Sequence, residues 1–287
     1  MRQGLLASPQ ARERLAFWLL RIALAIVLFP VLFILAYMVM RGAPGLTWEF
    51  LTAVPRSGMR AGGIFPAIIG TVYLVIGMLL VALPLGVFAA IYLSEYAHPS
   101  RWTRVIRLAI VNLAGVPSVV YGLFGLGFFV MFLRLGTSIA AGALTLAIMS
   151  LPIIITATEE ALRSVPASFR QVAYSLGATR WQMVRTAVLP YALPGILTGA
   201  ILGVSRAAGE TAPILFTVAA FYLPRLPQSI FDPAMTLPYH LYVLATQIPN
   251  VPARVTYGTA LVLVGLVILL NLAAIIIRAH FRRTRQW

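Results

Sequence analysis

Long apolar segments separated by short polar ones make up most of the sequence. A helix needs about 20 predominantly apolar residues to cross the core of a bilayer. Six segments approach or exceed this length: 22–40, 67–93, 118–133, 137–158, 193–221 and 256–277. The pattern predicts an all-α, polytopic membrane protein with six transmembrane helices, in which residues 1–287 form a single transmembrane domain.

The first apolar segment follows basic residues, as the apolar core of a signal peptide does. At about 19 residues it is longer than such a core usually is, and the sequence that ends it, MRGAPG, is not a small-residue cleavage site. We therefore expect this segment to be retained as a transmembrane helix.

The basic residues are distributed unevenly around the six segments. The chain carries 22 arginines and no lysine, against seven acidic residues, so its formal net charge is +15. Such a charge could indicate nucleic-acid binding. With a cytoplasmic N-terminus, however, 15 arginines fall on the cytoplasmic side, six in external loops and one, Arg206, inside a segment. This excess follows the positive-inside rule, so we expect a protein of the cytoplasmic (inner) membrane with both termini in the cytoplasm.

Several catalytic and metal-binding motifs are missing from the sequence. A Walker A loop needs a lysine, and the chain has none, so it cannot be a standard P-loop ATPase. The spacings GxSxG and HExxH are also absent. The chain has no cysteine, and its three histidines, His98, His240 and His280, lack the spacing of metal ligands. We expect no enzymatic activity, no cofactor and no metal site.

The predicted cytoplasmic loop 159–190 contains signals for two short helices. Ser168 and Gln171 fit the capping-box pattern that begins a helix, and Gly177 stands where a left-handed residue would end it. Thr179 and Gln182 fit a second capping box, whose helix is expected to end before Pro190. The sequence thus predicts a helix, a glycine turn and a second helix.

The second of these helices carries an apolar stripe that something must cover. Trp181, Val184 and Val188 recur at helical spacing. The stripe could lie on lipid headgroups, helped by nearby arginines, or dock into a groove of a cytoplasmic partner. A DNA-binding helix-turn-helix is disfavoured, because membrane segments begin within a few residues on both sides.

Two charges interrupt the apolar segment 193–221, in the sequence SRAAGETAP. Arg206 and Glu210 are four residues apart and so share a helix face. Each costs about 2.5 to 3.5 kcal/mol at the centre of a membrane helix, so we expect the site to have a function. One interpretation places both residues on a water-accessible path, where Arg206 attracts an anion and Glu210 either orients the arginine or accepts a hydrogen bond from the transported anion. The alternative is an internal pair that only neutralises itself, although arginine before glutamate is the less favourable order.

The loop resembles the EAA loop of ABC-importer permeases. Gln171, Val172 and Ala173 stand at the EAA positions, nine residues follow Gly177, and Leu-Pro closes the motif. Gln171 replaces the family's glutamate and Ala187 its isoleucine. The resemblance implies that the loop is the coupling helix that seats in the ATP-binding subunit, with these residues in the coupling loop: Gln171, Ala173, Gly177, Ala178, Trp181, Leu189 and Pro190.

The segment around Arg206 is similar to the SRAxGETAP signature of the PstA family of phosphate-importer permeases, which have the MetI-like fold. Further similar segments begin, in the same order, at Gly62, Pro84, Leu113, Leu151 and Thr236. The resemblance implies a second, PstC-like permease, a dimer of PstB-like ATP-binding subunits and an external PstS-like phosphate-binding protein as partners. It also implies that Arg206 takes part in phosphate passage.

These observations predict a permease subunit of an ATP-driven phosphate importer. Moving a dianion into a cell at −100 mV costs about 4.6 kcal/mol, twice the figure for one charge, so import needs external energy. Transport of another oxyanion remains an alternative. A self-contained anion channel or secondary transporter is another, although the inverted repeats expected of many transporters are not visible in the sequence.

Overall fold

The computed structural model describes residues 9–284 of the chain, and the side chains of residues 13–280. The predicted all-α class is confirmed, because nearly all of the regular structure is helical. The arginines predicted to lie near the termini, Arg2, Arg12, Arg282, Arg283 and Arg285, fall outside the described side chains.

The helices follow one another along the described chain, and one pair of short β-strands lies between α2 and α3. They are α1 (Pro9–Gly42), α2 (Trp48–Thr52), α3 (Phe65–Ile91), α4 (Arg101–Ala114), α5 (Ser118–Gly125), α6 (Ile139–Ser164), α7 (Ala167–Ser175), α8 (Arg180–Met183), α9 (Leu189–Gly209), α10 (Ala212–Thr217), α11 (Leu237–Thr246) and α12 (Ala253–Thr284). A 3₁₀ turn, η1 (Ala43–Gly45), follows α1, and the π-helical turns are η2 (Tyr92–Tyr96), η3 (Leu126–Phe132) and η4 (Val184–Val188). Strands β1 (Pro55–Arg56) and β2 (Ala61–Gly62) pair antiparallel.

Five helical stretches of the described chain are long and apolar enough to cross a membrane. They are Glu13–Gly45, Phe65–Tyr96, Ile139–Ser164, Arg180–Gly209 and Ala253–His280. A sixth crossing requires α4 and α5 with η3 to count as one broken span, bent by 101°. The predicted segment 118–133 is therefore only one arm of a bent pair. Pro117, the residue before α5, disfavours helical geometry in its predecessor and so separates the two arms.

The predicted span 193–221 is not one continuous helix. Helix α9 ends at Gly209, Glu210 is extended with φ −73° and ψ 135°, and α10 begins at Ala212. Pro213 accounts for the break, because it has no N–H to donate to the carbonyl of Gly209 and its ring would clash with that carbonyl. The two predicted charges therefore stand at the end of a helix and not at its centre.

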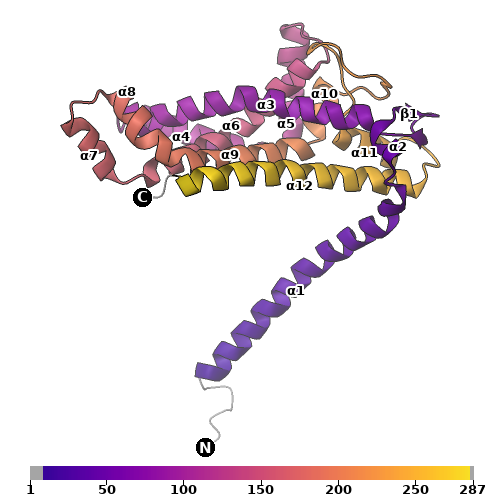
Figure 1. The fold of residues 1–287 in the computed structure, drawn as a ribbon, viewed down its shortest axis with the longest axis horizontal. Helices are drawn as coiled ribbons and strands as arrows, with labels where there is room; N and C mark the ends of the chain where they lie inside the picture. The colour runs from indigo at the N-terminus through magenta and orange to yellow at the C-terminus, as the bar shows by residue number, and fades with distance from the viewer. Residues whose placement is uncertain (1–8, 285–287) are drawn as a thin grey trace, which may run out of the picture.

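Helices α3, α6 and α9 form the centre of the bundle, with α12 packed against α9 (Figure 1). The largest buried side chains between them include Leu74, Met78, Leu146 and Ile154. Helix α3 approaches α6 closely at Gly86, where an added Cβ would lie 2.6 Å from Ile154 Cγ2. Tight packing of small and large residues thus holds the bundle together.

Helix α1 stands apart from this bundle. Figure 1 shows it slanting away, so that only its last part reaches α12. There Tyr37 meets the ring of Tyr257 edge-on, with centroids 5.5 Å apart. The membrane-length window of Glu13–Gly45 has none of its residues buried in the chain.

The two ends of the bundle differ in structure. Helices α7 and α8 lie at one end, which we call the hairpin end, and the strands with α2 and α11 lie at the other (Figure 1). The hairpin end has its own apolar cluster, which includes Ile91, Leu93, Leu162, Met183 and Val184. This cluster fixes α7 and α8 to the ends of α3 and α6.

Candidate functional site

Helices α7 and α8 form the predicted pair of helices around a glycine turn. Gly177 has φ +76°, a left-handed conformation that side chains with a Cβ rarely adopt. The turn closes through two backbone hydrogen bonds, from Gly177 N to Tyr174 O at 2.9 Å and from Ala178 N to Ala173 O at 3.1 Å. We call residues 167–188, which include α7, α8 and η4, the helical hairpin.

The second capping box is confirmed. Thr179 Oγ1 accepts a hydrogen bond from Gln182 N at 3.3 Å, and Thr179 N donates to Gln182 Oε1 at 2.8 Å. The first box is wrong: α7 starts at Ala167, its cap is Pro166, and no side chain caps it. Ser168 thus lies one residue inside the helix, because the proline sets the start earlier.

The prediction that the second helix ends before Pro190 is also wrong. Helix α8 continues through η4 directly into α9, which begins at Leu189. A π-helical turn widens the helix just before the proline, so the missing N–H interrupts the hydrogen-bond ladder without ending the helix. Helix α6 likewise extends to Ser164, so the helical hairpin is shorter than the predicted loop 159–190.

The apolar stripe on the second helix faces mainly inward. Val184 and Val188 are completely buried in the cluster at the hairpin end, and only Trp181 remains exposed, at 45%. The prediction that this stripe is covered is confirmed, but the chain itself, and not lipid or a partner, covers most of it. The stripe as a whole is therefore not an open docking surface.

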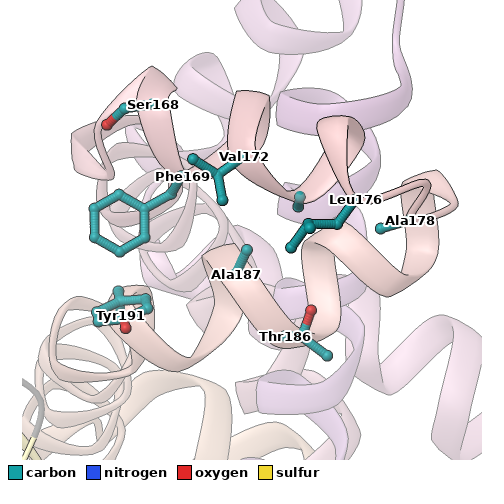
Figure 2. A pocket seen from close by; sticks show the side chains of 9 residues that line it. Ser168, Phe169, Val172, Leu176, Ala178, Thr186, Ala187 and Tyr191 are labelled. Carbon is teal, nitrogen blue, oxygen red and sulfur yellow. The ribbon is translucent and has the colours of Figure 1, made fainter.

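An apolar groove lies instead between α7 and the η4–α9 segment (Figure 2). Its volume is about 450 Å³, and its lining residues are Ser168, Phe169, Val172, Ala173, Leu176, Ala178, Thr186, Ala187 and Tyr191. The rings of Phe169 and Tyr191 meet edge-on at one end of the groove, with their centroids 4.7 Å apart. Val172 and Leu176 are 60% and 82% exposed, although both are apolar. We call this the α7 groove.

The α7 groove contains some of the sequence-predicted loop residues and not others. Ala173 and Ala178 line it, and Gly177 makes the turn beside it. Gln171 and Trp181 are exposed outside it, and Leu189 and Pro190 begin α9. Phe169 and Leu176 were not predicted as loop contacts, and Val172 was predicted only to stand at an EAA position, although the spacing of three and four residues places all three on one helix face.

The second candidate site lies where α9 ends. Arg206 Nε is 3.3 Å from Glu210 Oε1, so the predicted proximity of the two charges is confirmed. Arg206 lies in the last turn of α9, and Glu210 is its extended cap residue. Within the described part of the chain, the two terminal nitrogens of Arg206 make no hydrogen bond. Their four N–H groups can bind an anion through two parallel hydrogen bonds.

The surroundings of this pair leave it partly accessible. The side chains of Arg206 and Glu210 are 28% and 18% exposed, so neither is sealed in dry packing. Next to Arg206, Ser205 Oγ lies 2.7 Å from Asn271 Oδ1, which ties α9 to α12. Gly122 of α5 comes close to α10, because a Cβ there would lie 3.0 Å from Pro213 Cα. The helix break is therefore fixed by its neighbours on both sides.

One helix joins the two candidate sites. The stretch Arg180–Gly209 passes from the helical hairpin into α9 and ends just after Arg206. From Leu189 to Arg206 it rises about 25 Å at 1.5 Å per residue. A displacement of the hairpin along this helix would reach Arg206.

The sequence matches a family model over residues 82–286, described as the binding-protein-dependent transport system inner membrane component. The chain belongs to this family of ABC-transporter permeases. It is thus a membrane-embedded permease subunit, whose transporter also contains ATPase and substrate-binding subunits. The family is not a catalytic one, and ATP hydrolysis belongs to a separate subunit.

Individual relatives agree with this assignment. The permease is 35% identical over 276 residues to the probable ABC transporter permease protein YqgI of Bacillus subtilis, covering 91% of this chain and 93% of the relative. It is 38% identical over 247 residues to the phosphate transport system permease protein PstA 2 of Mycobacterium bovis, covering 86% and 81%. In fold it resembles a chain of a bacterial alginate ABC transporter, with a TM-score of 0.68 at 14% identity, covering 92% of this chain and 93% of that one.

Proposed function

We propose that this permease carries inorganic phosphate into the cell across the cytoplasmic membrane, driven by ATP hydrolysis on a separate subunit. Relatives named as phosphate transport permeases are 34% to 38% identical over most of the chain. The self-contained channel and the secondary transporter are disfavoured, because the chain belongs to a family of ABC permeases.

The observation that carries this proposal is the state of Arg206. A guanidinium in an apolar, membrane-length stretch is costly, yet Glu210 occupies only its Nε. The remaining N–H groups match the geometry of phosphate oxygens. Glu210 holds the guanidinium in place and reduces the local charge, which favours passage of an anion over its permanent capture.

The helical hairpin is proposed as the contact with the ATPase subunit. The exposed apolar residues of the α7 groove, chiefly Val172 and Leu176, need a partner with a complementary apolar surface. The proposed coupling loop retains Gln171, Ala173, Gly177, Ala178, Trp181, Leu189 and Pro190, with Phe169, Val172 and Leu176 added as the direct contacts.

The charge distribution supports a cytoplasmic hairpin end. Arginines gather on the segments that meet there: Arg101, Arg104 and Arg107 of α4, Arg163 of α6, Arg170 of α7, and Arg180 and Arg185 of α8 and η4. By the positive-inside rule this end faces the cytoplasm. Helix α12 ends on the same side (Figure 1), so we propose that the C-terminus, and with an even number of spans the N-terminus, is cytoplasmic.

The passage itself is proposed to form between two permeases. The Arg206 side chain is partly exposed on the surface of this chain, so a second permease, PstC-like in character, would complete its surroundings. A dimer of PstB-like subunits would hydrolyse ATP, and an external PstS-like protein would deliver phosphate. Each partner is an inference from the resemblance to PstA permeases.

Purification from the native membrane followed by reconstitution tests this function. The complex that copurifies with the permease should contain an ATPase and a second permease, and in liposomes it should import ³²P-phosphate only with ATP and the binding protein. The permease alone in liposomes is the control and should give no flux. Phosphate flux through the permease alone, or sulfate or molybdate in place of phosphate as the preferred cargo of the complex, would contradict the proposal.

A further inference from the structure

Both helices of the hairpin contact the same turn at the end of α3. That turn is η2, the π-helical segment Tyr92–Tyr96, which precedes α4. Glu95 belongs to this turn, and its side chain is only 6% exposed. Its carboxylate is paired with Arg170 of α7, 75 positions away in the sequence, through Nε to Oε2 at 3.1 Å and Nη2 to Oε1 at 2.7 Å.

The guanidinium of Arg170 also binds the end of α6. Its Nη1 donates to Val165 O and its Nη2 to Leu162 O, each at 2.8 Å. These carbonyls lie at the C-terminus of α6, where positive charge is favoured, and Leu162 O also accepts from Val165 N at 3.4 Å. Arg170 thus joins three elements, α3 through η2, α6 and α7, by four charge-assisted hydrogen bonds.

A second contact reaches the next residue of the same turn. Arg180, the first residue of α8, places its Cζ 5.1 Å from the centroid of the Tyr96 ring, within the range of a cation–π interaction. Adjacent residues of η2 are therefore held from the two helices of the hairpin, Glu95 from α7 and Tyr96 from α8.

A nearby ion-pair group has a different role. Glu159 of α6 binds Arg107 of α4 at 2.9 Å and Arg163 of its own helix at 2.6 Å. Neither of these arginines belongs to the hairpin. Arg107 also donates from Nη2 to Leu93 O of η2 at 2.8 Å, so this group joins α4 and η2 to α6. Arg163, which within the described residues bonds Glu159, offers a matched control position at the same end of the bundle.

We propose that Glu95 and Tyr96 are positioning residues that make η2 move with the helical hairpin, so that ATPase-driven movement reaches α3 as well as α9. The inference rests on the proposed function of the hairpin. The hairpin is continuous with α6 and α9 along the chain, whereas α3 is remote in sequence. Arg170 and Arg180 supply directional contacts from the hairpin to its end at η2, beside the bond from Arg107 of α4 to Leu93 O, while the surrounding apolar cluster is non-directional. Helix α3 packs along α6 and lies against α9, so its displacement would reshape the helices around the Arg206 region.

The first test measures phosphate imported per ATP hydrolysed by the reconstituted complex. Glu95→Gln keeps the shape of the side chain and removes its charge, so the charge-assisted hydrogen bonds from Arg170 become weaker. This shifts the balance between η2 attached to the hairpin and η2 detached from it, and we expect the ratio of phosphate to ATP to fall by about tenfold. The complex should still assemble and hydrolyse ATP. The control Arg163→Gln removes an exposed charge outside the hairpin and should leave the ratio unchanged. Equal ratios for the two variants would overturn the inference.

Substitutions at Tyr96 give an independent measurement. Tyr96→Phe keeps the ring that Arg180 contacts and should retain the wild-type ratio, whereas Tyr96→Leu should lower it severalfold. Indistinguishable Phe and Leu variants would contradict the role of this ring.

The movement can also be followed as a distance between two labelled positions, first in the wild-type background. The chain has no cysteine, so spin labels at His98→Cys and Ala167→Cys report the distance between the end of η2 and the start of α7. That distance should stay constant between nucleotide-free and ATP-trapped complexes and should become broadly distributed when Glu95→Gln is added. A change of several ångströms in the otherwise wild-type complex would overturn the inference even if Glu95→Gln fails to fold. Failure of the proposed function would look different, as a complex that lacks the ATPase or does not move phosphate at all.

Discussion

Replacing Gly177 isolates the backbone geometry of the helical hairpin from its side-chain contacts. Gly177 has φ +76°, and a Cβ added there would meet nothing within 4 Å. The cost of a side chain is therefore conformational and not steric. For residues with a Cβ the left-handed region costs about 1 to 2 kcal/mol, and asparagine tolerates it better than alanine.

This cost sets the expected loss of ATPase binding. If the strained hairpin adopts the binding-competent turn in only part of the molecules, the apparent Kd rises by the inverse of that fraction. A cost of about 1 to 2 kcal/mol corresponds to about fivefold to thirtyfold weaker binding. The series should rank Gly177, then Gly177→Asn, then Gly177→Ala, with Gly177→Val weakest because its β-branched side chain fits this region worst.

Titration of the purified ATPase subunit against the permease in nanodiscs measures these constants. Thermal unfolding of each permease variant serves as the control for global damage. Wild-type affinity for Gly177→Ala, or equal affinities for the Asn, Ala and Val variants, would refute the argument that the left-handed turn presents the α7 groove.

Three further substitutions test the cap, the packing and the polar site. Thr179→Ala removes the cap on Gln182 N, which costs about 1 kcal/mol, so the affinity for the ATPase subunit should fall about fivefold. Thr179→Ser keeps the hydroxyl and should bind like wild type. Equal affinities for the Ala and Ser variants would count against the role of the cap. A Cβ on Gly125 would clash with Thr145 Oγ1 and lie 2.8 Å from Thr217 Cγ2, so Gly125→Val should cost about 1 to 3 kcal/mol and lower the melting temperature by several degrees. A Cβ added at Gly127 would meet nothing within 4 Å, so a similar loss of melting temperature for Gly127→Val would contradict the packing argument. Glu210→Gln should lower the phosphate-to-sulfate uptake ratio about fivefold, because hydrogen phosphate can donate to a carboxylate and sulfate cannot; an unchanged ratio would assign selectivity to the external binding protein.

Features that depend on near neighbours in the sequence were predicted well. The glycine turn at Gly177 and the capping box of Thr179 each involve residues at most five positions apart, so the pattern itself contains the interaction. The proximity of Arg206 and Glu210 follows from helical spacing in the same way. Their function as a substrate path remains a prediction.

Helix breaks were predicted less well, because apolar composition does not distinguish a straight helix from a bent one. The predicted span 193–221 continues through Pro213, yet the helix ends at Gly209 and Glu210 is extended. Pro190, which the sequence predicts to end a helix, instead lies in the first turn of α9, directly after the π-helical turn η4. Whether a proline breaks or only perturbs a helix depends on tertiary packing around the freed carbonyl.

Contacts between distant segments could not be predicted from the sequence. Val184 and Val188 are buried in a cluster with residues of α3 and α6, so the stripe predicted to dock on lipid or on a partner lies mostly inside the protein. The pairing of Glu95 with Arg170 is equally non-local. Periodicity shows that a face must be covered, but it does not show by what.

Uptake of phosphate by Arg206 variants tests the central claim most directly. Arg206→Ala, Arg206→Lys and the exposed-loop control Arg225→Ala should be compared in reconstituted complexes of equal composition. Loss of a charge-assisted, paired donor predicts a fall in ATP-driven uptake of about tenfold to a hundredfold for Arg206→Ala. Arg206→Lys should retain part of the activity, and Arg225→Ala all of it. Wild-type uptake by an assembled Arg206→Ala complex would contradict the account, because phosphate would then cross the membrane without this guanidinium.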